Sequence, residues 1–367
     1  MKEQRLEQLV NWVKEENLSA CFLTSTPNVF YLTGFYTDPH ERLLGLLVFP
    51  DNEPAIVCPN MEREQVKKSG WTFGIIGYDD TDDPWEKVKE DVEKRNVTIE
   101  KLAIEQEHMT VSRFQKLQEI FPQAAFTSAE VKMYELRLTK DEDEVSILRE
   151  AAKLADFGVE VGVHNIKKGR TEQELVAIIE YELKKKGISQ MSFSTMALAG
   201  EKTASPHGKP GLDTIQHGDL VLFDLGVVLN GYCSDITRTV AFGDVGEKQQ
   251  DIYETVLKAQ TSTLEICKPG VEIGLIDRTA RSIITEKGYG EYFTHRIGHG
   301  LGIEVHEYPS MNATNTMKLQ KGMAFTVEPG IYKPSVGGVR IEDDILVTES
   351  GIEILTSYPK DLQIIKA

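Results

Sequence analysis

Residues 218–235, GDLVLFDLGVVLNGYCSD, carry an aspartate on each side of a hairpin turn signal. Asn230-Gly231 is typical of a two-residue turn between antiparallel strands. In such a hairpin, residues whose numbers sum to 461 face each other, so Asp235 faces Gly226. Asp224 then lies diagonally from Asp235 on the same face. Two like charges on a buried face are destabilising unless a cation compensates them, so the pattern indicates either a metal site or a solvent-exposed face.

The region around this hairpin belongs to one of two similar halves. Helical stretches run from Gly169 to Gly187 and from Gly270 to Gly288, each 18 residues from glycine to glycine. A glycine also precedes both Asp224 and Glu328 by six residues, through a strand-like run. The offsets between halves are 101 for the helix markers and 104 for the strand markers. The repeat predicts two related α+β halves, with an acidic residue at the end of a core strand in each and the site between them.

The residues before this region have a different organisation. Up to about residue 125, helical spacing alternates with short apolar runs such as Leu43–Phe49. This alternation predicts an α/β domain of the doubly wound type. Thr139, with Glu142 three residues later, is expected to cap the next helix. We therefore expect an N-terminal domain of residues 1–130 and a C-terminal domain of residues 131–367.

Composition excludes several classes of protein. The net charge is −17, from 58 acidic and 41 basic residues, which argues against nucleic acid as a partner. No apolar run reaches the roughly 18 residues of a membrane span. The charged first residues do not resemble a signal peptide. The 4 cysteines are scattered and show no disulfide or metal spacing, so we expect reduced thiols in a cytoplasmic protein.

Three further residues complete a candidate metal site. His299 lies between glycines that allow close approach of a ligand, although a structural histidine is the alternative. Glu328 precedes Pro329-Gly330, which ends a strand. Glu342 shares a strand face with Arg340, so an ion pair is the alternative there. With the two aspartates, these ligands suit Mn²⁺, Co²⁺ or Zn²⁺, and four carboxylates neutralise two divalent ions; we expect Mn²⁺.

The order of these motifs resembles that of the pita-bread metallopeptidases, which comprise methionine aminopeptidase, aminopeptidase P and prolidase. It runs from Asp to a second Asp eleven residues later, then His-Gly-x-Gly, Val-Glu-Pro-Gly and Val-Arg-Ile-Glu-Asp. Residues 326–332, TVEPGIY, and residues 338–343, GVRIED, resemble the prolidase and aminopeptidase P branch. The resemblance covers essentially the whole chain. It implies an α/β N-terminal domain followed by an α+β pita-bread domain with a pseudo-two-fold duplication.

The resemblance also implies a role for each candidate residue. The metal ligands would be Asp224, Asp235, His299, Glu328 and Glu342. Asp235 and Glu342 would bridge both ions, and Glu328 would also act as general base. His207 and His306 match two family histidines that would steady the substrate carbonyl and the developing oxyanion. Arg340 would orient the ligand shell or bind a substrate carboxylate.

One position departs from the family pattern. Several prolidases have an arginine four residues after the second histidine, where it can hold the prolyl carboxylate, but here that residue is Ser310. Arg296 is the nearest alternative anchor. The charged loop of residues 37–42 offers His40 and Arg42 and resembles a loop of some bacterial prolidases, although it can equally be a solvated loop.

The resulting functional hypothesis is a two-metal peptidase that cleaves before proline. A Xaa-Pro dipeptidase is the first expectation, and a Xaa-Pro aminopeptidase acting on longer peptides is the alternative. A non-catalytic pita-bread binding protein or a metal-free creatinase-like member would have lost ligands, whereas all five are present. The expected partners are a proline-containing peptide and a second copy of the chain, with the loop of residues 37–42 near the partner's metal cleft.

Overall fold

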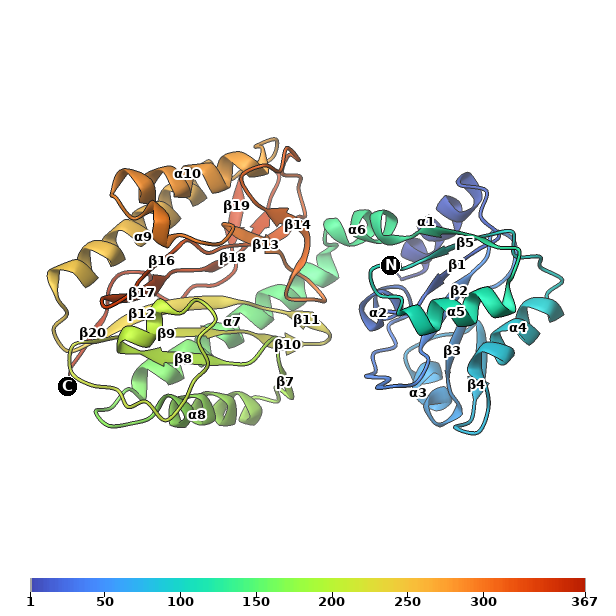
Figure 1. Ribbon diagram of the computed structural model, residues 1–367, viewed down its shortest axis with the longest axis horizontal. Helices are drawn as coiled ribbons and strands as arrows, with labels where there is room; N and C mark the ends of the chain where they lie inside the picture. Colours follow the sequence, from blue (N-terminus) through green and yellow to red (C-terminus); the bar gives the residue numbers. More distant parts are fainter. Residues whose placement is uncertain (1, 367) are drawn as a thin grey trace. The chain divides into compact units, whose positions relative to one another are not determined.

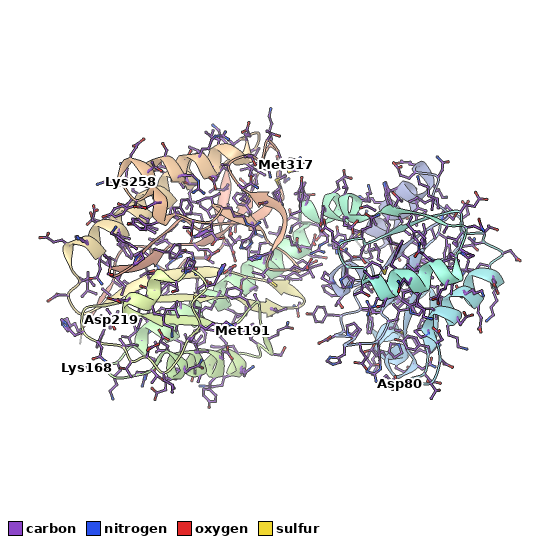
Figure 2. All side chains as sticks on the ribbon, viewed as in Figure 1. Asp80, Lys168, Met191, Asp219, Lys258 and Met317 are labelled. Atoms are coloured by element: carbon purple, nitrogen blue, oxygen red, sulfur yellow. The ribbon has the colours of Figure 1, made fainter. Side chains whose placement is uncertain are left out.

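A computed structural model describes residues 2–366, which form two compact units divided between Arg137 and Leu138. Side chains fill the space between helices and sheets in each unit (Figure 2). The division falls later than residue 130 because the helix α6 (Glu130–Leu138) is fastened to the first unit. The Tyr31 hydroxyl donates to the carbonyl of Leu136 at 2.5 Å, and Arg137 donates to the Asn28 side chain at 2.8 Å.

The N-terminal unit is a sheet with helices packed on it (Figure 1). Its strands lie in the order β4-β3-β2-β1-β5-β6. The strands are β1 (Ala20–Leu23), β2 (Gly45–Val48), β3 (Ala55–Pro59), β4 (Gly74–Tyr78), β5 (Lys101–Ile104) and β6 (Ala125–Ser128). The other helices are α1 (Lys2–Glu15), α2 (Thr26–Thr33), η1 (Asn60–Glu62), α3 (Arg63–Lys68), α4 (Pro84–Lys94) and α5 (Val111–Ile120).

This sheet is mixed, which corrects the expectation of a doubly wound domain. Strand β2 runs antiparallel to both β1 and β3, whereas β1, β5 and β6 are parallel to one another. The short turn after Phe49 explains the difference, because β2 and β3 are joined by a hairpin rather than by a crossover helix. The α/β class of the unit is as expected.

The first half of the C-terminal unit contains two helices followed by strands. Its elements are α7 (Glu142–His164), α8 (Glu172–Lys185), β7 (Gln190–Met191), β8 (Met196–Ala199), η2 (Gly200–Ala204), β9 (Asp219–Leu225), β10 (Val227–Leu229), β11 (Tyr232–Cys233) and β12 (Ile236–Phe242). One sheet has the order β20-β12-β9-β8, and a smaller one has the order β11-β10-β7.

The second half repeats the same plan. Its elements are α9 (Glu247–Ile266), α10 (Ile273–Glu286), η3 (Gly290–Tyr292), β13 (Gly298–Gly300), β14 (Glu307–Met311), β15 (Ala324–Val327), β16 (Gly330–Lys333), β17 (Gly337–Arg340), β18 (Asp343–Val347), β19 (Ile352–Ile354) and β20 (Ile364–Ile365). Its sheets have the orders β14-β13-β15-β18-β19 and β16-β17. Figure 1 shows α8 and α10 on opposite sides of the sheets, and each helix pair packs on its own half.

The two halves of the C-terminal unit share equivalent backbone hydrogen bonds. The amide of Gly169 donates to Ile215 at 2.9 Å, and the amide of Gly270 donates to Leu319 at 2.8 Å. These two pairs are related by the offsets of 101 and 104 seen in the sequence. The strand pairs β9–β12 and β15–β18 are equivalent, so each half delivers its acidic residue at the end of a core strand. The expected pseudo-two-fold architecture is confirmed.

The hairpin around residue 230 has the expected register. Asn230 and Gly231 have φ angles of 49° and 85°, as a two-residue turn between twisted strands requires. Strand β9 pairs with β12 so that Asp224 lies opposite Thr237. A Cβ atom at Gly226 would lie 1.7 Å from the carbonyl oxygen of Ser234, so only glycine fits this close approach.

The start of α7 differs from the expectation. The helix is capped by Asp141, whose side chain accepts from the amide of Glu144 at 3.0 Å, and the Glu144 carboxylate accepts from the amide of Asp141 at 2.9 Å. Thr139 instead forms a β-bridge with Met323, which commits its backbone to the sheet. The expected capping role of Thr139 was therefore wrong by two positions. No helix within residues 2–366 is long and apolar enough to cross a membrane.

Candidate active site

The expected ligands line one cavity of about 410 Å³ in the C-terminal unit. Its walls are Phe193, Met196, Pro206, His207, Asp224, Asp235, His295, Arg296, His299, Val305, His306, Glu328, Tyr332, Arg340 and Glu342. Asp224 and Asp235 come from the first half, where Asp224 lies in β9 and Asp235 directly precedes β12. His299 lies in β13, while Glu328 and Glu342 follow β15 and β17. The cavity therefore depends on both halves.

The candidate ligand atoms converge within bonding range of a shared ion. Asp235, His299 and Glu342 each offer one ligand atom within 4.8 Å of the others. The Nε2 atom of His299 lies 3.7 Å from Asp235 Oδ2 and 3.5 Å from Glu328 Oε1. All three side chains of the first group are buried, as a metal centre shielded from bulk water requires.

The imidazole of His299 is prepared to act as a ligand. Its Nδ1 atom lies 3.1 Å from the carbonyl oxygen of Gly300, and a carbonyl can only accept. The proton is therefore on Nδ1, and Nε2 directs its lone pair toward the carboxylates. Burial, together with the smaller effect of His306, lowers the pKa of His299 to about 3, so the ring is neutral at physiological pH.

Arg340 and Thr237 orient two of the carboxylates. Arg340 donates from Nη2 to Asp224 Oδ2 and from Nε to the Thr237 hydroxyl at 3.0 Å. That hydroxyl donates in turn to Glu342 Oε2 at 2.6 Å. A single guanidinium thus fixes Asp224 directly and Glu342 through Thr237. Its third contact is a donation to the Tyr332 hydroxyl at 2.8 Å.

Burial and mutual repulsion raise the pKa values of three carboxyl groups. The pKa of Glu342 rises to about 8, first because burial disfavours its charge and then because Asp224 is close. The pKa values of Asp235 and Glu328 lie well above their ordinary range for the same reasons, first burial and then the repulsion of Glu342. Without a cation, these groups cannot all ionise at neutral pH.

Two buried oxygen atoms show that the donor set fits metal ions. Oδ1 of Asp224 and Oδ1 of Asp235 accept no hydrogen bond from any described residue. Buried carboxylate oxygens normally have partners, because leaving one unpaired costs free energy. A divalent cation would bind these free lone pairs, and the combination of carboxylates with one imidazole suits Mn²⁺, Co²⁺ or Zn²⁺.

The two further histidines lie at the same cavity. The ring centroids of His299 and His306 are 4.1 Å apart. Burial lowers the pKa of His306, and Arg296 lowers it further, so His306 is a neutral hydrogen-bonding group. His207 lies in the loop after η2 and lines the cavity wall.

The four expected substrate-binding residues are divided between the units. Arg296 lines the cavity and donates from Nη1 to the Ser310 hydroxyl at 3.1 Å. Arg340 also lines the cavity, where it binds Asp224 and the Thr237 hydroxyl. His40 and Arg42 lie in the N-terminal unit, where Arg42 donates to both oxygens of Asp80, a residue labelled in Figure 2, at 2.9 and 3.1 Å.

Sequence reasoning missed two polar residues of the cavity. His295 Nε2 lies 2.8 Å from the Tyr332 hydroxyl, and its Nδ1 lies 2.8 Å from the carbonyl of Arg296. The Tyr332 hydroxyl accepts from Arg340, so its own proton goes to His295. Burial lowers the pKa of His295 to about 4, which keeps the ring neutral for this arrangement. Tyr332 belongs to the TVEPGIY motif, which was the available signal for it.

Residues 146–349 match metallopeptidase family M24, and residues 5–139 match the creatinase/prolidase N-terminal domain. The chain belongs to metallopeptidase family M24 and is a hydrolase built as the prolidases are. Peptidases of this family use divalent metal ions, for which the buried cluster is the candidate site.

Individual relatives support this assignment along the whole chain. A putative dipeptidase of Bacillus subtilis, YkvY, is 55% identical over 361 residues, covering 98% of this chain and 99% of the relative. The structure of a Xaa-Pro dipeptidase from Bacillus anthracis matches with a TM-score of 0.93 at 35% identity, over 100% of both chains. That of an X-Pro aminopeptidase from Thermotoga maritima matches with a TM-score of 0.86 at 31% identity, over 95% of this chain and 98% of that one.

Proposed function

We propose that this peptidase hydrolyses the bond before proline in Xaa-Pro dipeptides, with two divalent metal ions held by the five cavity ligands. The observation that carries the dipeptide assignment is the guanidinium of Arg296. It lines the cavity, and within residues 2–366 its hydrogen bond is to the neutral Ser310 hydroxyl rather than to a carboxylate. A guanidinium that forms no ion pair with a carboxylate of the described residues, at a substrate cavity, is suited to binding an anionic group.

The proposed roles of the other residues follow from their contacts. Asp224, Asp235, His299, Glu328 and Glu342 would hold the ions, with Asp235 and Glu342 shared between them. When bound, such a pair activates a water molecule and polarises the substrate carbonyl. Glu328 is proposed to take the proton of the attacking water, because it is a cavity carboxylate whose Oε1 atom lies 3.5 Å from His299 Nε2, beside the proposed ligands. His207 and His306 would donate hydrogen bonds that stabilise the developing oxyanion.

Arg296 is proposed to replace the arginine that several prolidases have at the position of Ser310. The amide of Ile297 donates to Met311 at 3.2 Å, and His299 lies opposite Ser310, so β13 and β14 run side by side here. A long arginine side chain from the segment before β13 thereby reaches the position of residue 310. We propose that it supplies the cation that several prolidases carry on the neighbouring strand.

The apolar side of the cavity suits the rest of the substrate. Phe193, Met196, Pro206 and Val305 offer no charge and would pack against the proline ring. We also propose a homodimer that works in the cytoplasm with Mn²⁺, and with Co²⁺ or Zn²⁺ as alternative ions. The four free, buried cysteines fit a reducing compartment.

A Xaa-Pro aminopeptidase remains the alternative, favoured by Ser310 and by the likeness to the Thermotoga maritima enzyme. The two hypotheses are separated by assaying the Mn²⁺-loaded protein on Xaa-Pro and Xaa-Pro-Yaa peptides. We expect preference for the dipeptide, and no turnover after chelation. Preference for the tripeptide would establish the aminopeptidase instead.

The variant Arg296→Ala tests the anchor itself. Losing a charge-assisted hydrogen bond costs about 1.5–3 kcal/mol, so KM for Xaa-Pro should rise about 10-fold or more. KM for Xaa-Pro-Yaa should change much less, because its carboxylate lies one residue further out. The control Arg149→Ala removes an arginine that pairs with Glu353 at 2.7 Å outside the cavity. Equal losses for both peptide lengths would show that Arg296 supports the β13 segment rather than the substrate.

A further inference from the structure

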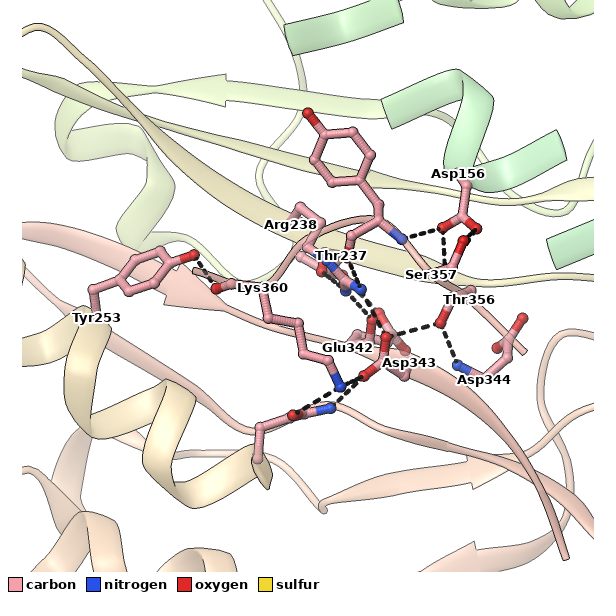
Figure 3. Close-up of polar contacts among 12 residues, drawn as sticks. Asp156, Thr237, Arg238, Tyr253, Glu342, Asp343, Asp344, Thr356, Ser357 and Lys360 are labelled. Atoms are coloured by element: carbon pink, nitrogen blue, oxygen red, sulfur yellow. Dashed lines mark hydrogen bonds and ion pairs between the residues drawn. The ribbon is translucent and has the colours of Figure 1, made fainter. Parts of the chain in front are cut away.

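A buried charge network lies directly behind the ligand Glu342 (Figure 3). Its centre is Asp343, which is fully buried and pairs with Arg238 at 2.7 Å and with Lys360 at 2.6 Å. Gln260 of α9 also donates to Asp343, at 2.5 Å. One carboxylate is thus held by two cations and an amide. Buried ion pairs contribute little net stability, because desolvation offsets their attraction, so this arrangement calls for another explanation.

The network holds both the backbone and the side chain of Glu342 in place. Arg238 donates from Nη1 to the carbonyl of Glu342 at 2.5 Å and to that of Thr237 at 3.0 Å. The amide of Glu342 donates to the Thr237 carbonyl at 3.1 Å, and the Thr237 hydroxyl donates to its carboxylate. Arg238 therefore fixes the backbone of Glu342, and a shift of its guanidinium would displace this residue.

The remaining contacts of the network come from a segment near the C-terminus, residues 356–360. The Thr356 hydroxyl donates to Asp343 Oδ1 at 2.8 Å, and Lys360 binds the other oxygen of that carboxylate. The carbonyl of Tyr358 accepts from Nε and Nη2 of Arg238, at 2.9 and 2.7 Å. This segment fixes Arg238 on the side facing away from the cavity.

Both halves of the unit hold the segment in turn. Asp156 of α7 accepts from the amides of Ser357 and Tyr358, both at 2.9 Å to its Oδ1. Tyr253 of α9 donates from its hydroxyl to the carbonyl of Lys360 at 2.6 Å. Figure 3 shows Asp156 and Tyr253 at the two ends of the network, with Asp343 between them. Residues 356–360 are therefore held between α7 and α9, which are equivalent helices of the two halves.

We propose that residues 356–360 are a positioning element for the metal ligand Glu342, and that Lys360 is its principal positioning residue. The proposal rests on the metal centre of the proposed function. Metal ligands need partners that fix their orientation, and loss of such a partner commonly lowers metal affinity about 10- to 100-fold. Lys360 acts on the ligand through Asp343 and Arg238, and it does not line the cavity.

Mn²⁺ titration of the metal-free protein by calorimetry tests the proposal. Lys360→Met should weaken Mn²⁺ binding about 10-fold, whereas Lys360→Arg, which keeps the cation, should bind close to the native level. If Lys360 acted only through its charge, Lys360→Met would bind Mn²⁺ more tightly than the native protein, because a nearby cation repels Mn²⁺. The control Lys321→Met removes an exposed lysine that pairs with Glu349. Unchanged or tighter binding by Lys360→Met would overturn the proposal.

A second pair of variants covers a failure of Lys360→Met to fold, which its melting curve would reveal. Thr356→Val keeps the shape but loses the bond to Asp343, and Thr356→Ser keeps the hydroxyl. Weaker Mn²⁺ binding by Thr356→Val than by Thr356→Ser supports the positioning role, and equal binding contradicts it. The native titration separates the two proposals. Native protein that binds two Mn²⁺ ions without cleaving Xaa-Pro contradicts the proposed function alone, whereas native protein that binds none contradicts both.

Discussion

At the scale of residues, the cavity concentrates acidic groups that repel one another. Glu342 and Asp235 are buried and Glu328 is partly buried, and all three have raised pKa values; Arg340 is the guanidinium that contacts their neighbour Asp224. A carboxyl group whose pKa is higher in the folded than in the unfolded state stabilises the fold only while it is protonated. These carboxyl groups therefore destabilise the metal-free protein once they ionise, and we expect bound metal ions to relieve their repulsion.

This repulsion predicts an unusual dependence of stability on pH. The pKa of Glu342 rises from 4.5 to about 8, so its stabilising contribution is complete below 4.5 and is lost as the pH rises through 8. The pKa values of His295 and His299 are lowered from 6.5, so these two groups make the protein more stable as the pH rises toward 6.5. Their contribution no longer changes above that pH. We expect Tm of the metal-free protein to fall between pH 6.5 and 8.

Differential scanning calorimetry with and without Mn²⁺ measures this effect. In the loaded protein the carboxylates are paired with cations, so Tm should change little over the same range, and the gain from Mn²⁺ should increase with pH. A metal-free Tm that is constant or rises from pH 6.5 to 8 would show that these carboxyl groups titrate normally.

Single residues differed in how far the sequence could predict them. The five proposed ligands lie in motifs whose glycines and prolines mark strand ends, so their place along one cavity followed from local pattern. His295 and Tyr332 are 37 residues apart and meet only because the segment before β13 lies against β16. Arg238 and Lys360 gave no signal either, since a buried ion pair has the same sequence appearance as two surface charges. Contacts made by tertiary packing were beyond local reasoning.

At the scale of elements, the β9–β12 hairpin places Asp235 relative to Asp224. The backbone of Ser234 approaches Gly226 so closely that a Cβ atom added at residue 226 would overlap the Ser234 carbonyl. Inserting atoms into a packed region usually costs about 1–3 kcal/mol. Gly226→Ala should destabilise the protein by that amount and also weaken Mn²⁺ binding, because Ser234 is the neighbour of the ligand Asp235.

Urea denaturation and Mn²⁺ titration of Gly226→Ala check this expectation against Gly351→Ala. A Cβ at Gly351 would meet no atom within 4 Å, so this control should behave as the native protein does. If Gly226→Ala matched Gly351→Ala in both measurements, the hairpin would be more tolerant than its geometry indicates.

Elements with a strong repeat or turn signal were predicted well, and the others were not. The Asn230-Gly231 turn set the register from residue 219 to residue 242 because each pairing follows from the turn. The glycines that end helices in both halves marked the duplication. In the N-terminal unit, apolar runs predicted the strands but not their directions, because a buried strand has the same apolar pattern whichever way it runs. That is why the mixed sheet was missed.

At the scale of the whole molecule, the proposed homodimer depends on the loop of residues 37–42. His40 and Glu41 have side chains that are 70% and 76% exposed, and His40 has a positive φ of 51°. Such exposed charge, held in an uncommon backbone conformation, suits a segment that acts on another molecule. We expect light scattering to give twice the chain mass of 41.2 kDa.

Dilution provides the accompanying test of this dimer. If the loop completes the partner's cavity, specific activity should fall as the dimer dissociates, and His40→Ala should lower activity without changing the mass. A monomer that keeps its full specific activity at every dilution would contradict the dimer.

The duplicated architecture has a consequence for how such a protein could arise. Each half folds around its own sheet but delivers only part of the ligand set, with Asp224 on one side and Glu328 on the other. An ancestor with the length of one half would have formed a complete centre only where two copies met, and only at concentrations that favoured their association. Joining the copies in one polypeptide would make that encounter intramolecular. It would also free the two sides to diverge, and Asp224 and Glu328 hold equivalent positions in the two halves of this chain.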